Sequence, residues 1–194
     1  MFKRYFMFLM IFVIFTGCSD PDSNNSNNVN NSNNTNNINN SNNTNKIPPD
    51  FMTFPAVVQL VSDGDTIHVE YLGRSIKIRF KGVNAPEIAH NGTPAEPFGV
   101  DAMDFVKSHS PVGSFVGLEF DDDRCGSENP PASCFDVYDR MLAYIRTEEN
   151  QDLGAQLLVN GYAEVYTAAE FNRKTVYLQY QQQAVDAQVG IWSD

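Results

Sequence analysis

The sequence predicts an α+β fold, a five-stranded OB-type β-barrel with about three helices. Two observations lead to this expectation. Five segments between residues 56 and 147 have the alternating or β-branched composition of strands. Three other segments have helical periodicity, one placed after the third strand and two after the fifth.

The first two strands are expected at 56–61 and 67–72, on either side of "DGDT" at 63–66. Asp-Gly between two β-type runs is a strong hairpin signal. A plain turn explains this stretch without any chemistry. Asp65, together with Asp63, is nevertheless a candidate ligand for a hard cation that binds oxygen.

The third strand, expected at 75–83, alternates strictly between apolar and basic side chains. Its apolar positions predict one buried face. The other face carries three cations, Lys77, Arg79 and Lys81. These are candidate contacts for a polyanion.

Two stretches carry polar residues at strand ends. In "RFKGVNAPE", 79–87, the proline makes a rigid turn that can hold Asn84, a backbone carbonyl and Glu87 at fixed positions. The alternative is a solvated corner. In "YDRMLAYI", Arg140 begins a strand, where an arginine is usually a surface residue. It gains a role if it meets the same phosphate as Arg79, because two guanidinium forks suit that anion.

The remaining elements follow from hydrophobic period. In chain order they are a helix at 95–110, a strand at 114–120, an acidic loop at 121–136, a strand at 140–147 and helices at 151–163 and 170–188. Pro111 bars the first helix from continuing. Gly161 is the expected stop of the second helix and Gly190 of the third.

The N-terminal segment, 1–17, has the features of a secretory signal. Lys3 and Arg4 precede "YFMFLMIFVIF", an apolar run of the usual ~7–15 residues. A membrane-spanning helix needs roughly 20 apolar residues and is the alternative. The following "FTGC" resembles the lipobox of bacterial lipoproteins, which implies cleavage before Cys18 and lipid attachment to it. The resemblance places an exported protein on a bacterial membrane, at the outer membrane, in the periplasm or at the cell surface.

Residues 18–46 contain the lipidated cysteine and a run of Asn and Ser that we expect to be a disordered tether. Residues 47–194 then form one domain. With Cys18 lipidated, Cys125 and Cys134 remain, and an oxidising compartment favours a disulfide between them. Free thiols and a metal site are the alternatives.

The net charge is −11, so there is no general electrostatic attraction to nucleic acid. A polyanion has to be bound by a local cluster of cations, with or without a metal ion. We therefore expect nucleic-acid binding, if it occurs, to be local and sensitive to salt.

Taken in order and spacing, "DGDT", "RFKGVNAPE" and "YDRMLAYI" resemble the staphylococcal nuclease (thermonuclease) family, and "GIW" near the C-terminus supports this. The resemblance covers residues 54–192. It implies an OB-type barrel with three helices, and a calcium-dependent phosphodiesterase that cuts DNA or RNA as an endonuclease. We expect the protein to be a monomer.

The resemblance also implies roles for individual residues. Glu87 activates water while Arg79 and Arg140 stabilise the phosphate. The calcium ligands that it implies are Asp65, Asn84 and the backbone carbonyl of Ala85, and Asp63 in the same turn is a further candidate. By the resemblance, Tyr138 and Tyr166 match tyrosines near the nucleotide. Lys77 and Lys81, from the basic face of the third strand, complete the candidate substrate-binding residues.

Asn84 departs from the family pattern, which commonly has an aspartate there. An amide oxygen coordinates calcium without contributing charge, so we expect looser calcium binding. Two other functions remain open. One is a catalytically inactive OB-fold protein that binds nucleic acid, and the other is a surface interaction lipoprotein.

Overall fold

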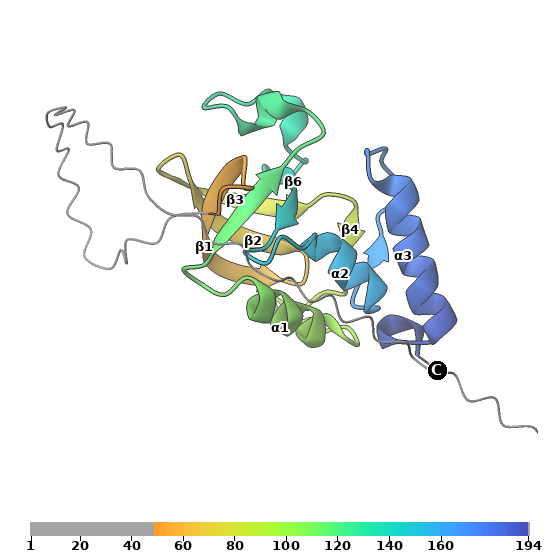
Figure 1. Cartoon of the computed structure of the whole chain (residues 1–194). Coiled ribbons are helices and arrows are strands. Elements are labelled where there is room, and N and C mark those ends of the chain that lie inside the picture. Colours follow the sequence, from red (N-terminus) through yellow and green to blue (C-terminus); the bar gives the residue numbers. More distant parts are fainter. Residues whose placement is uncertain (1–48, 194) are drawn as a thin grey trace, which may run out of the picture. The chain divides into compact units, whose positions relative to one another are not determined.

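The structure, a computed structural model, describes residues 49–193 and shows a closed five-stranded barrel with three α-helices (Figure 1). The strands are β1 (Phe54–Asp63), β2 (Thr66–Tyr71), β3 (Arg74–Phe80), β4 (Val83–Asn84), β5 (Phe115–Glu119), β6 (Met141–Arg146) and β7 (Glu164–Val165). The α-helices are α1 (Gly99–His109), α2 (Leu153–Val159) and α3 (Lys174–Ala187). The expected α+β barrel is therefore confirmed. The expected signal segment, the lipidated Cys18 and the tether lie outside the described residues.

The barrel closes in the strand order β1-β2-β3-β6-β5. Neighbouring strands are antiparallel except β3 and β6, which run parallel with Arg79 opposite Leu142. This parallel pair places the C-terminal end of β3 beside the chain that follows Arg140. The alternation predicted for β3 is confirmed, because Ile78 and Phe80 are buried in the barrel while Lys77 is exposed.

The expected end of the third strand is wrong. We predicted one strand over 75–83, but β3 stops at Phe80. Gly82 has a φ of 77°, a conformation that favours glycine, so the chain turns there before β4. Lys81 therefore lies in a turn rather than on the strand face, and its Nζ pairs with Asp121 at 2.8 Å.

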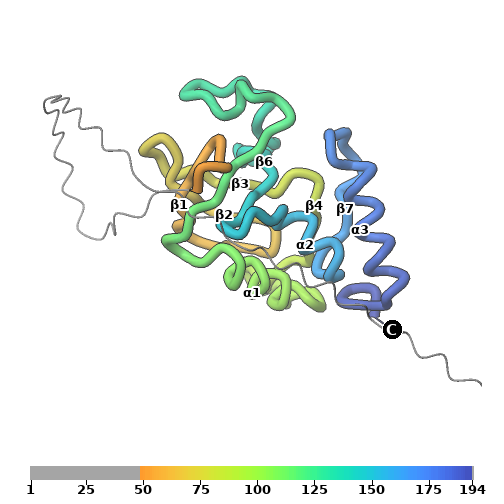
Figure 2. Tube along the Cα trace, in the orientation of Figure 1, coloured from red at the N-terminus to blue at the C-terminus, as the bar shows by residue number. Residues whose placement is uncertain are grey.

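The two-residue strands β4 and β7 form a second, small sheet that the sequence did not indicate. Val83 pairs with Val165 and Asn84 with Glu164. In Figure 2, β7 lies between β4 and α3, which connects the polar corner after β3 to the C-terminal helix. The helices begin later than expected, α1 at Gly99 and α3 at Lys174.

A charged cluster fastens α2 and α3 to the barrel. Glu119, at the end of β5, accepts hydrogen bonds from Arg146 and Arg173. Arg173 also pairs with Asp152 at 2.6 Å. The Tyr177 hydroxyl donates to the same Asp152 carboxylate at 2.9 Å. No helix within residues 49–193 is long and apolar enough to cross a membrane.

The expected disulfide is confirmed, since Cys125 and Cys134 are bonded with their Cα atoms 5.5 Å apart. The loop closed by this disulfide packs against the barrel. The Tyr71 hydroxyl donates to the Gly126 carbonyl at 2.5 Å. A Cβ at Gly126 would lie 2.4 Å from the Phe54 ring, so only glycine permits this close approach.

Candidate active site

The turn between β1 and β2 places Asp65 in a buried position at the barrel rim, with 3% of the residue exposed. Its carboxylate accepts hydrogen bonds from the Ala85 N–H at 2.8 Å and the Thr66 hydroxyl at 3.0 Å. A Cβ at Gly64 would lie 2.7 Å from the Cβ atoms of Ala85 and Ala102. Glycine in "DGDT" therefore lets the turn pack tightly against α1 and the corner after β3.

Arg79 projects from β3 into this same group of residues. Its guanidinium pairs with Asp65 and donates to the Asn84 side-chain oxygen at 3.0 Å. Burial, and then the nearby charge of Arg140, lower the pKa of Arg79 to about 10. Arg79 remains a cation at neutral pH. Arg140 reaches the same group of residues, because its Nη1 lies 3.5 Å from the hydroxyl of Thr66, which donates to Asp65.

Arg140 is held by Asp136, a residue to which the sequence analysis gave no role. The Asp136 carboxylate accepts from the Arg140 Nε at 2.7 Å and from the backbone N–H groups of Tyr138 and Arg140 at 2.9 and 3.0 Å. Asp139, between them, has a φ of 58°. An aspartate that bonds the N–H two residues later is the signature of an Asx turn, and this pattern could have identified Asp136. Arg140 also lies 3.5 Å from the Thr66 hydroxyl.

Glu87 lies beside Asp63. Burial, and next the charge and hydrogen bond of Asp63, raise the pKa of Glu87, while Arg79 acts in the opposite direction. The Glu87 backbone is fixed by Glu96, because the Glu87 N–H donates to the Glu96 carboxylate at 3.0 Å and the Glu96 N–H donates to the Glu87 carbonyl at 2.9 Å. A Cβ at Gly99 would lie 2.5 Å from the Glu87 carbonyl oxygen, so the start of α1 fits closely under this corner.

Asn84 bridges Arg79 and Glu164. Its side-chain oxygen accepts from Arg79, and its Nδ2 donates to the Glu164 carboxylate at 3.1 Å. Glu164 therefore sets which end of the amide faces the site. The role of Glu164 has no signal in the sequence, because Glu164 reaches Asn84 only through the pairing of β4 with β7.

The donors around this corner fit a hard cation. They are oxygen atoms of Asp63, Asp65, Asn84 and Glu87, which is the ligand chemistry of calcium. Asp63 and Glu87 bring two carboxyl groups into contact, an arrangement that a proton or a cation has to relieve. Within residues 49–193, however, no three His, Cys, Asp or Glu side chains already form a compact metal cluster.

The predicted substrate-binding residues do not all gather at this corner. Tyr138 is exposed and its ring centroid lies 5.3 Å from the Arg140 guanidinium carbon. Lys77 is exposed on β3, and Lys81 is paired with Asp121. Tyr166 follows β7, where its N–H donates to the Gly82 carbonyl at 3.0 Å.

Comparisons with known proteins show which family the sequence resembles. The family model described as staphylococcal nuclease homologue matches residues 77–194. Endonuclease YhcR of Bacillus subtilis is 33% identical over 153 residues, which cover 73% of this chain but 12% of that much longer protein. Thermonuclease of Staphylococcus hyicus is 31% identical over 135 residues, covering 69% of this chain and 73% of that protein. Probable endonuclease LCL3 of Podospora anserina is 31% identical over 138 residues, covering 64% and 44%.

Proposed function

The chain belongs to the staphylococcal nuclease homologue family, and on this premise we propose that it is a calcium-dependent phosphodiesterase that hydrolyses DNA, RNA or both by internal cleavage. The supporting observation is the pair of neighbouring guanidinium groups at the barrel rim. Arg79 pairs with Asp65 and Arg140 pairs with Asp136, and Arg140 lies 3.5 Å from the Thr66 hydroxyl that donates to Asp65, so two like charges are held close together. An anion between them, such as the phosphate of a diester, would offset that repulsion.

In this proposal, the two arginines bind the non-bridging oxygens of the phosphate. Asp65 and Asp136 hold them before substrate arrives, so little reorganisation is needed as negative charge develops. The guanidinium forks also orient the diester for in-line attack.

Glu87 is the proposed general base. It removes a proton from the water as the water oxygen bonds to phosphorus, and that proton ends on the Glu87 carboxylate. The P–O ester bond opposite the water breaks, and the leaving oxygen departs with the electron pair and takes a proton from solvent. Burial, and then the charge and hydrogen bond of Asp63, raise the pKa of Glu87 toward the range in which a carboxylate accepts a proton efficiently. The backbone bonds to Glu96 fix the corner from which Glu87 projects.

Asp65, the Asn84 side-chain oxygen, the Ala85 carbonyl and Asp63 would hold calcium, which when bound neutralises charge on a phosphate oxygen. Arg79 contacts both Asp65 and Asn84, so it has to share or release these oxygens when the site is loaded. This competition and the neutral amide of Asn84 both favour a modest calcium affinity.

We also propose that the protein acts outside the cytoplasm, anchored through lipidated Cys18. This rests on the signal and lipobox-like stretch of the sequence. Metabolic labelling with radioactive palmitate in a bacterial host tests this anchor. The wild type should take up the label and Cys18→Ser should not. Label that persists in the variant would contradict the anchor.

The test of the enzymatic proposal is cleavage of plasmid DNA and single-stranded RNA by the full chain, in calcium and in chelator, beside Glu87→Gln. We expect cleavage in calcium, none in chelator, and a loss of about 10²–10⁴ in kcat in the variant. Glu170→Gln is the matched control, because Glu170 is an exposed carboxylate that pairs with Lys174 on α3.

Cleavage that persists in chelator would contradict the calcium requirement, and full activity of Glu87→Gln would contradict the role of Glu87. Binding of substrate by the wild type without any cleavage would instead support an inactive nucleic-acid-binding protein.

A further inference from the structure

The cations of this acidic protein are almost all neutralised internally. Among the described residues, the lysines and arginines that pair with carboxylates are Arg79, Lys81, Lys107, Arg124, Arg140, Arg146, Arg173 and Lys174. Within residues 49–193, the exceptions are Arg74 and Lys77, which form no ion pair. These two exposed cations line the same pocket.

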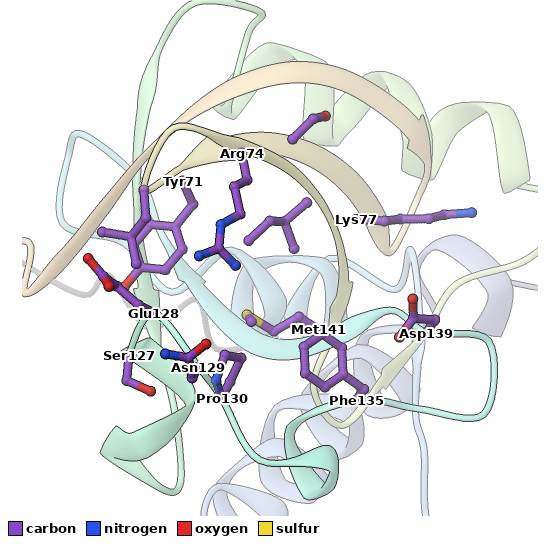
Figure 3. A pocket seen from close by; sticks show the side chains of 13 residues that line it. Tyr71, Arg74, Lys77, Ser127, Glu128, Asn129, Pro130, Phe135, Asp139 and Met141 are labelled. Carbon is purple, nitrogen blue, oxygen red and sulfur yellow. The ribbon is translucent and has the colours of Figure 1, made fainter.

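This pocket, which we call the hairpin–loop pocket, lies between the β2–β3 hairpin and the disulfide-closed loop (Figure 3). Its volume of about 580 Å³ is in the usual range for ligand pockets. Figure 3 shows the Arg74 side chain hanging from the hairpin into the pocket and Lys77 on the side nearer Asp139.

The lining of the pocket suits one nucleotide. Phe135 and Met141 supply an aromatic and an apolar surface against which an unstacked base can lie. Asn129 and Glu128 supply groups that can hydrogen-bond the edge of a base. Arg74 offers a free guanidinium for a phosphate.

The pocket is lined by chain neighbours of the candidate active-site residues Arg79 and Arg140. Lys77 and Arg79 are two residues apart on β3, so they point to the same side at a spacing of about 6.6 Å. Asp139 and Met141, which line the pocket, flank Arg140 in the chain. A strand whose phosphate lies between Arg79 and Arg140 can therefore reach the pocket with its neighbouring nucleotide.

We propose that the hairpin–loop pocket binds one unpaired nucleotide of a nucleic-acid strand next to the scissile linkage, with Arg74 contacting its phosphate and Lys77 lying on the side of the pocket nearer Asp139. This inference rests on the proposed nuclease function. The acidic Glu128 and Asp139 at the pocket limit its positive charge, so the site suits a single strand inserted locally rather than the broad face of a duplex.

The test compares Arg74→Gln with Lys107→Gln in the full chain. Lys107 is an exposed cation on α1 outside the pocket, paired with Asp104, so its loss removes the same charge elsewhere. The substrates are a dinucleotide and a single-stranded octanucleotide. We expect Arg74→Gln to raise KM for the octanucleotide about tenfold with unchanged kcat. Cleavage of the dinucleotide should be unaffected, because its single phosphate is the scissile one and leaves none for Arg74.

A second readout is the binding of a fluorescent octanucleotide, measured by anisotropy in chelator as salt is varied. Loss of one phosphate contact should reduce the slope of log Kd against log salt by about 0.7 in Arg74→Gln and leave it unchanged in Lys107→Gln. Equal affinities and equal slopes in the wild type and Arg74→Gln would contradict nucleotide binding in the hairpin–loop pocket. Failure of the wild type to cut either substrate would overturn the nuclease proposal separately, because the binding measurement does not need cleavage.

Discussion

The two arginines at the barrel rim, Arg79 and Arg140, are each positioned by a carboxylate. Arg79 and Arg140 sit side by side because Asp65 and Asp136 each neutralise one of them. Without these carboxylates, two partly buried guanidinium groups would repel each other and turn toward solvent. The aspartates thus do the positioning, and the arginines remain charged for an anion.

Asn84 carries the sharpest prediction about a single residue. Asn84→Asp adds a charge to the proposed calcium site. It also places a carboxylate against Glu164, which in the wild type accepts a hydrogen bond from the Asn84 amide. We therefore expect Asn84→Asp with Glu164→Gln to bind calcium about tenfold more tightly than the wild type, since one charge at ~4 Å is worth about 1–4 kcal/mol. Asn84→Asp alone should gain less.

Calorimetric titration of calcium into the full-length proteins measures this without reference to activity. Glu164→Gln alone is the control and should not improve binding. If neither variant that carries Asn84→Asp binds calcium more tightly, residue 84 is not a ligand.

At the scale of elements, the sequence predicted most of what long, regular patterns encode. The five barrel strands, the helices and the disulfide were anticipated, because period, turn residues and cysteine count are local or arithmetic signals. The β4–β7 pair was not, because two-residue strands are too short to show a period. Asp136 and Glu164 were missed for a related reason, since their roles depend on contacts made after folding.

The cluster around Glu119 gives a prediction for the attachment of α2 and α3. Burial would raise the pKa of Glu119, but hydrogen bonds from Arg146 and Arg173 outweigh it and leave the pKa below the ordinary 4.5. A group whose pKa is lower in the folded state stabilises the fold above its unfolded pKa and loses that contribution as pH falls. We expect Glu119→Gln to lower the free energy of unfolding by about 1–2 kcal/mol at pH 7, a figure reduced for solvent screening.

Urea denaturation at several pH values between 7 and 3 measures this difference. The difference in stability should shrink as pH falls below 4.5 and through the lower folded pKa of Glu119. The wild-type carboxyl group is then protonated and, like the glutamine side chain, uncharged. A difference between wild type and Glu119→Gln that stays constant with pH would mean that the charge of Glu119 does not fasten the helices.

Considered as a whole molecule, the protein is an acidic chain with its positive charge confined to a few places. The net charge of −11 opposes long-range attraction to a polyanion. Most described cations, including the two arginines at the rim, are paired with carboxylates, and the unpaired Arg74 and Lys77 lie in the hairpin–loop pocket. Arg74, Lys77 and Arg79 are on β3, and Arg140 directly precedes β6. Substrate capture therefore depends on contacts made after encounter.

The central claim is that Arg79 and Arg140 act together on one phosphate, and a double-mutant cycle tests it most directly. The measurement is kcat/KM of the wild type, Arg79→Lys, Arg140→Lys and the double variant with a labelled single strand in calcium. Because groups that act as a unit are not additive, we predict that the double variant loses clearly less activity than the product of the two single losses. Losses that multiply independently would contradict a shared phosphate.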